Sequence, residues 1–173
     1  EFVDPFTHAS SPNLTMSVTF APDTLTGFSA FGGDAYKGHI YARVSNPTVR
    51  QLDIKLAALE GAESCQCFAS GMAATHALIM GRLSAGDHLV MSDTNYVATA
   101  ELVRSTLPRF GVETSLIDTS DIEAIAAAIK SNTKMVWIET PANPIMRLSD
   151  IKAIASLSHA RGVRDVAVDS TFA

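Results

Sequence analysis

The stretch that decides the fold reads KMVWIETPANP and spans residues 134–144. Residues 135–138 are all apolar, which is typical of a parallel strand that is buried on both faces of its sheet. In the turn that follows, Pro141 and Pro144 restrict the backbone around Asn143 and so fix where its amide points. Because ligands bind beyond the carboxyl ends of the strands in open α/β sheets, we expect this turn to border a binding site.

Strands and helices alternate on both sides of this stretch. Short apolar runs predict strands over residues 65–69, 88–92, 112–118, 134–140 and 163–169. Periodic segments predict helices over residues 71–83, 98–110, 121–130 and 150–161. Ser70 and Ser149 are the expected N-caps of the first and last of these helices, Pro108 is expected to fray the second, and Gly162 to close the last. This order predicts an α/β fold with a mostly parallel sheet and helices on both faces.

The first part of the chain has a different character. Residues 1–47 show no sustained period and are rich in Pro, Gly, Ser and Thr, which predicts an extended arm that packs on a partner subunit. A helix is expected to begin around Thr48, where Gln51 stands at capping-box spacing, and to stop at Gly61. Its apolar face would consist of Val49, Leu52, Leu56 and Leu59. We therefore expect an arm over residues 1–47 and an α/β domain over residues 48–173.

The composition fits a globular α/β protein, since 47% of the 173 residues are hydrophobic and 18% are charged. A net charge of -5 gives no electrostatic reason to expect binding to nucleic acid or to an anionic membrane. No apolar run reaches the length of a membrane span, and residues 1–5 lack the features of a signal peptide. We expect a cytoplasmic protein.

Two cysteines, Cys65 and Cys67, stand one residue apart. On a strand they would share a face but be poorly placed to bridge each other. No histidine or further cysteine follows at ligand spacing, so we expect buried thiols in a reducing compartment and no metal site.

Residues with useful chemistry follow several of the predicted strands. Ser70, Gly71 and Met72 open a helix whose N–H groups would suit a phosphate, although Ser70 could be only a structural cap. Tyr96 could stack on a flat cofactor or could simply pack. Asp169 ends an apolar strand, where a carboxylate needs a partner such as a protonated pyridine nitrogen.

Four blocks of the sequence, in this order, resemble the Cys/Met-metabolism family of pyridoxal phosphate (PLP) enzymes: YARVSNPT (41–48), ASGMA (69–73), ETPANP (139–144) and VDSTFA (168–173). That family includes cystathionine γ-synthase, cystathionine γ- and β-lyases, methionine γ-lyase and O-acetylhomoserine sulfhydrylase. The resemblance covers nearly the whole chain and implies the large domain of a PLP-dependent transferase of fold type I.

The resemblance implies roles at the phosphate end of the cofactor. Gly71 and Met72 would bind the phosphate through backbone N–H groups, with Ser70 at the same turn. Tyr41 and Arg43 would reach the phosphate in a neighbouring subunit, so the active unit would be at least a homodimer and, in this family, a homotetramer. An arginine can fork onto a phosphate, although a solvated arginine beside a packed tyrosine would be the better interpretation if the pair stood alone.

The resemblance also implies roles around the pyridine ring. Tyr96 would stack on the ring and take part in proton transfer, and Asp169 would pair with the ring nitrogen. Asn143 would contact the phenolic oxygen, Thr171 would lie close to the ring, and Glu139 would support the site.

The lysine that holds the cofactor in this family follows a Ser-x-Thr-Lys motif downstream of the Asp-x-Thr-Phe strand. Residues 131–134, SNTK, imitate the motif, but they precede Glu139 and so would form a surface turn at the other end of their strand. We expect residues 1–173 to be the N-terminal portion of the enzyme, without its C-terminal domain, and to be inactive by themselves.

The substrate evidence in the sequence is divided. Ile40 stands where cystathionine enzymes tend to carry an acidic residue, and it resembles methionine γ-lyase. Glu101 replaces an arginine of the cystathionine enzymes, Ala98 replaces a cysteine typical of methionine γ-lyase, Val97 replaces a glycine, and Ser170 replaces an asparagine.

The first functional hypothesis is a PLP-dependent carbon–sulfur lyase or transferase that eliminates or replaces the γ-substituent of methionine, homocysteine or a cystathionine-type amino acid. Methionine γ-lyase is the first choice, followed by cystathionine γ-synthase or γ-lyase and O-acetylhomoserine sulfhydrylase. The hypothesis from another class is a non-catalytic fragment that lacks the PLP lysine and pairs with the remaining part of the enzyme.

Overall fold

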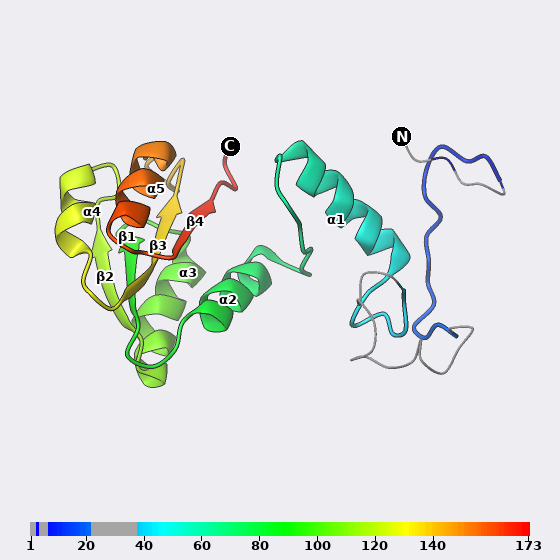
Figure 1. Ribbon diagram of the computed structural model, residues 1–173, viewed down its shortest axis with the longest axis horizontal. Coiled ribbons are helices and arrows are strands. Elements are labelled where there is room, and N and C mark those ends of the chain that lie inside the picture. Colours follow the sequence, from blue (N-terminus) through cyan, green and yellow to red (C-terminus); the bar gives the residue numbers. More distant parts are fainter. Residues whose placement is uncertain (1–2, 4–6, 22–37) are drawn as a thin grey trace. The chain divides into compact units, whose positions relative to one another are not determined.

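A computed structural model describes residues 3, 7–21 and 38–173 (Figure 1). The chain divides into two compact units, Glu1–Phe68 and Ala69–Ala173. Helix α1, which we expected to open the α/β domain, belongs by its contacts to the first unit, and the expected domain boundary after residue 47 stays a prediction. Part of the expected arm lies outside the described residues.

The first helix, α1, spans Pro47–Leu59 and is capped by Asn46, not by Thr48 as predicted. The Asn46 side chain accepts hydrogen bonds from the N–H groups of Thr48 and Val49, while Pro47 fills the first helical position, where its missing N–H costs nothing. Thr48 Oγ1 instead bonds the preceding arm, accepting from the N–H of Thr15 at 2.9 Å. The arm residues before α1 are thus tied to the start of this helix.

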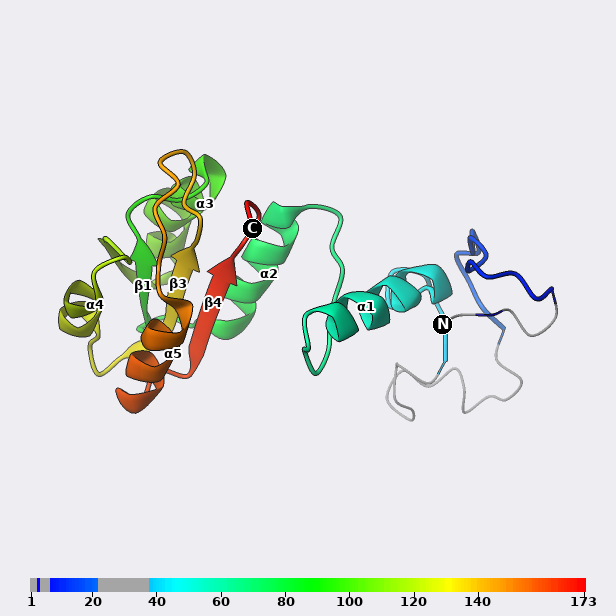
Figure 2. The ribbon, with the colours of Figure 1, turned by 90° about the horizontal axis from the view of Figure 1, so that it is seen from above.

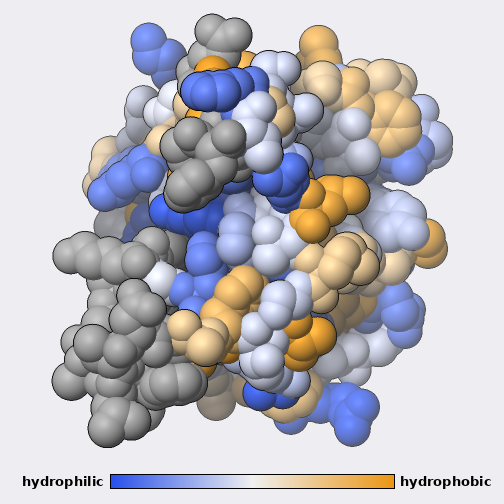
Figure 3. All heavy atoms as spheres, turned by 90° about the vertical axis from the view of Figure 1, so that its right-hand side faces the viewer, coloured by the Kyte–Doolittle hydropathy of each residue, from blue (hydrophilic) through white to orange (hydrophobic). Residues whose placement is uncertain are grey.

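The first unit leaves several large apolar side chains exposed, and apolar side chains lie among polar ones on the face seen in Figure 3. They include Leu14, Met16, Leu52 and Leu59. Such exposure agrees with an arm that packs on another surface, which stays a prediction.

No strand forms at residues 65–69, where the apolar run predicted one. The segment is extended, with Cys65 and Cys67 half-buried and Gln66 exposed, but within the described residues it pairs with no neighbouring strand. A strand exists only through its ladder of hydrogen bonds to a neighbour, so local propensity alone did not suffice.

The second unit is built on a four-stranded sheet in the order β2-β1-β3-β4. Its strands are β1 (His88–Ser92), β2 (Glu113–Ile117), β3 (Thr133–Glu139) and β4 (Asp165–Asp169). Every pair is parallel, and β1 and β3 are central and almost completely buried. The predicted parallel α/β class is confirmed.

Helices cover both faces of the sheet (Figures 1 and 2). On one face, α2 (Gly71–Arg82) and the segment that begins with α3 (Val97–Glu101) pack on Leu89, Met91 and Trp137. On the other, α4 (Ile122–Ala128) and α5 (Ile151–Ala160) pack on Val90, Val136 and Ile138. The continuous apolar runs of β1 and β3 follow from this arrangement, since side chains on both faces are buried.

The helix predicted over residues 98–110 changes its winding twice. After α3 comes a π-helical turn, η2 (Leu102–Thr106), and then a 3₁₀ turn, η3 (Leu107–Phe110). Pro108 has no N–H to continue the α pattern, and Leu107 donates instead to the Leu102 carbonyl, five residues back. Gly111 ends the segment with φ 71°, where a side chain would press on Ala85.

The last helix, α5, is capped by Asp150 and not by Ser149 as predicted. Asp150 accepts from the N–H of Ala153 at 2.9 Å, while the hydroxyl of Ser149 bonds that of Thr119 at 3.0 Å. Either Ser149 or Asp150 could cap this helix. The hydrogen bond of Ser149 to Thr119 leaves Asp150 as the cap. Among the residues described, no helix is both long and apolar enough to cross a membrane.

Candidate cofactor site

A cavity of about 310 Å³ lies in the second unit at the carboxyl ends of the strands. Glu139 and Asp169, the last residues of β3 and β4, are register partners and both line it. Its remaining lining residues come from the start of α2, from the loop after β1 and α3, and from the segments after β3 and β4: Ser70, Gly71, Met72, Thr75, Tyr96, Thr99, Asn143, Thr171 and Phe172. The structure thus brings seven of the nine predicted cofactor residues to one cavity.

The start of α2 forms one wall of the cavity. Ser70 is its N-cap as predicted, and its hydroxyl accepts from the N–H of Ala73 at 3.1 Å. The N–H groups of Gly71 and Met72 have no acceptor within the described part of the chain. A side chain at Gly71 would meet no atom within 4 Å, so open space adjoins this turn. Unpaired donors at the positive end of a helix, with room in front of them, suit a phosphate.

The side chain of Glu139 is the structural centre of the site. It is only 4% exposed, and its two oxygens accept from the N–H of Tyr96 at 2.6 Å and the N–H of Asn143 at 2.9 Å. One carboxylate therefore holds the loop after β1 and the loop after β3 in fixed positions. These bonds satisfy a charge that would otherwise be costly to bury.

Asp169 presents its carboxylate to the cavity in a fixed orientation. Its Oδ1 accepts from the N–H of Thr171 at 3.1 Å and from the Thr171 hydroxyl at 2.6 Å. The described residues supply no donor to Oδ2. An anionic oxygen that is not already hydrogen-bonded suits a protonated ring nitrogen, which is the partner that PLP would offer.

Tyr96 precedes α3, is 46% exposed and lines the cavity. An exposed ring held through its backbone by Glu139 is available to stack on a flat cofactor. Thr99, one turn further along, donates from its hydroxyl to Met72 Sδ at 3.5 Å and so joins α3 to the start of α2.

Three lining residues, Thr75, Thr99 and Phe172, were not predicted. Thr75 follows Gly71 by four residues and Thr99 follows Tyr96 by three, so helical spacing places each on the face of a predicted residue. That periodicity could have found both threonines. Phe172 had no signal beyond its position beside Thr171.

Tyr41 and Arg43 lie in the first unit. The Arg43 guanidinium carbon is 5.1 Å from the centre of the Tyr41 ring, and the backbone of Tyr41 forms an isolated bridge with Thr19. The two side chains are therefore neighbours, as a joint role requires. Their action on the phosphate of a partner subunit stays a prediction.

No lysine is among the described residues that line the cavity. Lys134, the last residue of the imitating motif, is half-buried in β3 itself, and not in a surface turn as expected. It stands five residues before Glu139, which amounts to about 16 Å along a strand. Lys134 therefore lies toward the end of the sheet opposite the cavity, as its position in the sequence predicted.

The loop between β3 and α5 is closed by its own contacts. The backbones of Ala142 and Arg147 form an antiparallel bridge, and Arg147 Nη1 pairs with Asp93 at 2.9 Å and Asp118 at 2.7 Å. Hydrogen bonds from Ser120, with a smaller contribution from Arg147, lower the pKa of Asp118. Arg147 thereby connects the loop that carries Asn143 to the residues after β1 and β2.

Comparison with known proteins identifies the class to which this fold and cavity belong. The sequence model of the Cys/Met metabolism PLP-dependent enzymes matches residues 2–173, and the chain belongs to that family. Pyridoxal phosphate is the cofactor of the family, in agreement with the donors and the carboxylate of the cavity.

Among curated relatives, L-methionine gamma-lyase of Porphyromonas gingivalis is 44% identical over 89% of this chain and 39% of its own length. Cystathionine gamma-synthase of Mycobacterium tuberculosis is 38% identical over 98% of the chain and 42% of its own length. The chain thus spans about two-fifths of the relatives it matches.

Solved structures agree with the family. Cystathionine gamma-lyase from Lactobacillus plantarum, complexed with L-serine, matches with a TM-score of 0.87 at 34% identity and covers 99% of this chain and 42% of its own. The crystal structure of metB from Corynebacterium glutamicum gives 0.85 at 38% identity, over 96% and 41% of the two chains.

Proposed function

We propose that this chain supplies the cofactor cradle of a PLP-dependent lyase or transferase of sulfur amino-acid metabolism. The observation that carries the proposal is the meeting of the α2 N-terminus, the Tyr96 ring and the Asp169 carboxylate around one cavity. An anion site, a stacking surface and an acceptor for a ring N–H are the three features that a phosphorylated pyridine needs.

Each residue has a task in this proposal. Gly71 and Met72 donate to the phosphate, Tyr96 stacks on the ring, and Asp169 accepts a hydrogen bond from the ring nitrogen and keeps it protonated. Glu139 holds Tyr96 and Asn143 in place through their backbones. When bound, the cofactor withdraws electrons from an attached amino acid, which makes its bonds easier to break.

Among substrates, we propose methionine or homocysteine with γ-elimination, as in methionine γ-lyase. The names of the relatives support this choice, since the P. gingivalis protein is a methionine gamma-lyase, and so does the apolar Ile40. Glu101 and Ala98 do not add support, and relatives named cystathionine gamma-synthase and O-succinylhomoserine sulfhydrylase favour γ-replacement as the alternative.

The proposal includes partners. Tyr41 and Arg43 would act on the phosphate of a neighbouring subunit in a homodimer or homotetramer, and the lysine would come from sequence beyond residue 173. The cytoplasm stays the expected compartment.

The test uses the complete polypeptide that contains these residues, supplied with PLP and methionine. We expect release of an α-keto acid and of a thiol, and a decrease of at least about 100-fold in kcat for Asp169→Asn, since a neutral partner no longer keeps the ring protonated. Asp87 directly precedes β1, at the end of the strands opposite the cavity. Asp87→Asn is therefore the matched control and should leave kcat unchanged. Replacement of the acyl group of O-succinylhomoserine by a sulfur nucleophile, without elimination from methionine, would favour the alternative.

A second candidate function is a non-catalytic chain, which the lack of a lysine in the described cavity lining favours. Borohydride reduction with PLP followed by intact-mass spectrometry separates the two. An adduct on a lysine beyond residue 173 supports the enzyme, whereas absence of any adduct in the complete polypeptide supports the non-catalytic chain.

A further inference from the structure

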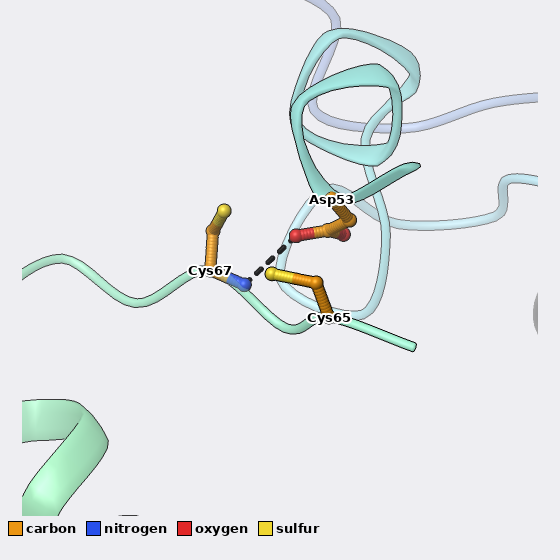
Figure 4. Close-up of side chains that lie close together, drawn as sticks. All are labelled: Asp53, Cys65 and Cys67. Atoms are coloured by element: carbon orange, nitrogen blue, oxygen red, sulfur yellow. Dashed lines mark hydrogen bonds between the residues drawn. The ribbon is translucent and has the colours of Figure 1, made fainter. Parts of the chain in front are cut away.

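Asp53, Cys65 and Cys67 form a cluster within the first unit (Figure 4). Asp53 comes from α1, and the cysteines come from the extended segment that follows it. One carboxylate oxygen and the two sulfur atoms all lie within 4.8 Å of one another. Spacing along the sequence did not reveal this cluster, because Cys65 stands twelve positions after Asp53 and only folding brings them together.

The cluster is held in place by its own backbone. The side chain of Asp53 is 4% exposed, and its Oδ1 accepts from the N–H of Cys67 at 2.8 Å. Because Gln66 is exposed while its two neighbours are half-buried, the extended segment presents both thiols on one side, toward the carboxylate.

The Asp53 carboxylate has no cationic partner in the part of the chain that the structure describes. A group of potential anions in so small a volume is a favourable place for a cation.

We propose that Asp53, Cys65 and Cys67 bind a zinc-class divalent metal ion, with water in the fourth position. Two thiolates and a carboxylate are ligands that Zn²⁺ accepts. Tetrahedral coordination with Zn–S of about 2.3 Å places two sulfurs about 3.8 Å apart, so movements on the order of 1 Å suffice. Binding releases the two thiol protons to solvent and forms two Zn–S bonds and one Zn–O bond, with no change of oxidation state.

The test uses the complete polypeptide, untagged, reduced and metal-free, titrated with Co²⁺. We expect a sulfur-to-cobalt charge-transfer band and the visible bands of tetrahedral cobalt, complete at one equivalent and abolished by Zn²⁺. Because two protons leave for each ion bound, the affinity below neutrality should rise by about 100-fold for each unit by which the pH is raised. Absence of the charge-transfer band, or an affinity independent of pH, would overturn the site.

Variants separate ligands from neighbours. Cys65→Ser and Cys67→Ser should each weaken Co²⁺ binding by at least about 100-fold, more than the loss of an outer contact does. Asp53→Asn keeps an acceptor for the Cys67 N–H but removes the charge, and should weaken binding at least about tenfold. Gln66→Ala, between the cysteines, should bind as the parent does. Circular dichroism verifies folding, and parent-like affinity in folded Asp53→Asn or Cys67→Ser would refute the proposal.

Discussion

Glu139 is the residue on which the geometry of the cavity depends most directly. Its carboxylate is buried and accepts one backbone N–H from each of two loops, the loop of Tyr96 and the loop of Asn143. Glu139 therefore positions Tyr96 and Asn143, whose side chains would face the cofactor, by holding their backbones.

Replacing Glu139 by glutamine should destabilise the protein. One of the two N–H donors would then face an NH₂ group instead of an oxygen, and an unsatisfied buried donor costs about 1–3 kcal/mol. Urea unfolding measures the loss, and Glu123→Gln, exposed in the first turn of α4, should change the free energy of unfolding by less than about 0.5 kcal/mol. Equal effects of the two substitutions would contradict the central role of Glu139.

His88 joins three strands at the opposite end of the sheet. Its Nδ1 lies 2.8 Å from Thr133 Oγ1 and its Nε2 lies 2.9 Å from Ser115 Oγ. Thr133 Oγ1 also accepts the N–H of Lys130. In its neutral form the His88 ring donates from one nitrogen to one of these hydroxyls and accepts from the other hydroxyl at its second nitrogen.

Stability should fall when the solution becomes acidic because of His88. Burial and the nearby charge of Lys130 lower its pKa below 6.5, and Glu113 opposes them in part. Below pH 6.5 the unfolded chain binds a proton that the folded chain does not, so unfolding becomes easier down to the folded pKa, by at most about 1.4 kcal/mol per pH unit.

Unfolding curves between pH 7.5 and about 5 check this expectation. His88→Gln, which can still accept and donate, should show a shallower decrease than the parent. His159→Gln, on the exposed last turn of α5, should keep the parental slope. A parental slope in His88→Gln would assign the acid sensitivity to other groups.

At the scale of elements, the loop between β3 and α5 is held by Arg147. The guanidinium reaches Asp93 and Asp118, the residues that follow β1 and β2, while the backbone of Arg147 pairs with Ala142. The ion pairs are partly exposed, so their importance lies in fixing the loop more than in stabilising the whole fold.

Arg147→Ala should therefore loosen the loop without unfolding the sheet. Hydrogen exchange of residues 142–149 should become faster by about tenfold or more, while the amides of β1 and β3 keep the parental rates, because local opening precedes global unfolding. Arg82→Ala removes an ion pair with Asp165, the first residue of β4, and serves as the matched control. Unchanged exchange in the loop would show that the backbone bridge alone holds it.

The sequence predicted those elements whose local pattern agrees with their place in the fold. The buried runs of β1 and β3 and the Ser70 cap of α2 fall where the sequence predicts them. Where neighbouring residues compete, as Asn46 does with Thr48, a long-range contact decides, and no local rule contains it. The missing strand at residues 65–69 has the same origin, since pairing depends on a neighbour.

At the scale of the molecule, much of the candidate site was predictable because Tyr96, Asn143 and Asp169 follow or end strands whose carboxyl ends lie together. These three residues are far apart in sequence, and the parallel order brings them to one cavity, whereas Ser70 lines it as the N-cap of α2. The Asp53 carboxylate beside Cys65 could not be predicted in this way, because it depends on the course of the chain after α1.

Cofactor binding should stabilise the whole chain. Pyridoxine 5′-phosphate, which has no aldehyde to react with lysines, should raise the free energy of unfolding by about 2.7 kcal/mol at a hundred times its Kd. Gly71→Asp places a negative charge at the anion site and should abolish this gain, whereas Gly81→Asp, further along the same helix, should keep it. Equal gains in both variants would place the phosphate elsewhere.

Among the strands that the structure describes, β4 pairs with β3 alone and so has a neighbour on one side. The carbonyl of Asp169 accepts from the Thr140 N–H, so the alternate residues Val166 and Val168 direct their backbone groups away from β3. Two amide protons and two carbonyls at this edge are thus available to another strand. A segment that docks there would extend the sheet beside Asp169, and the exchange of those two amides with deuterium would report its arrival.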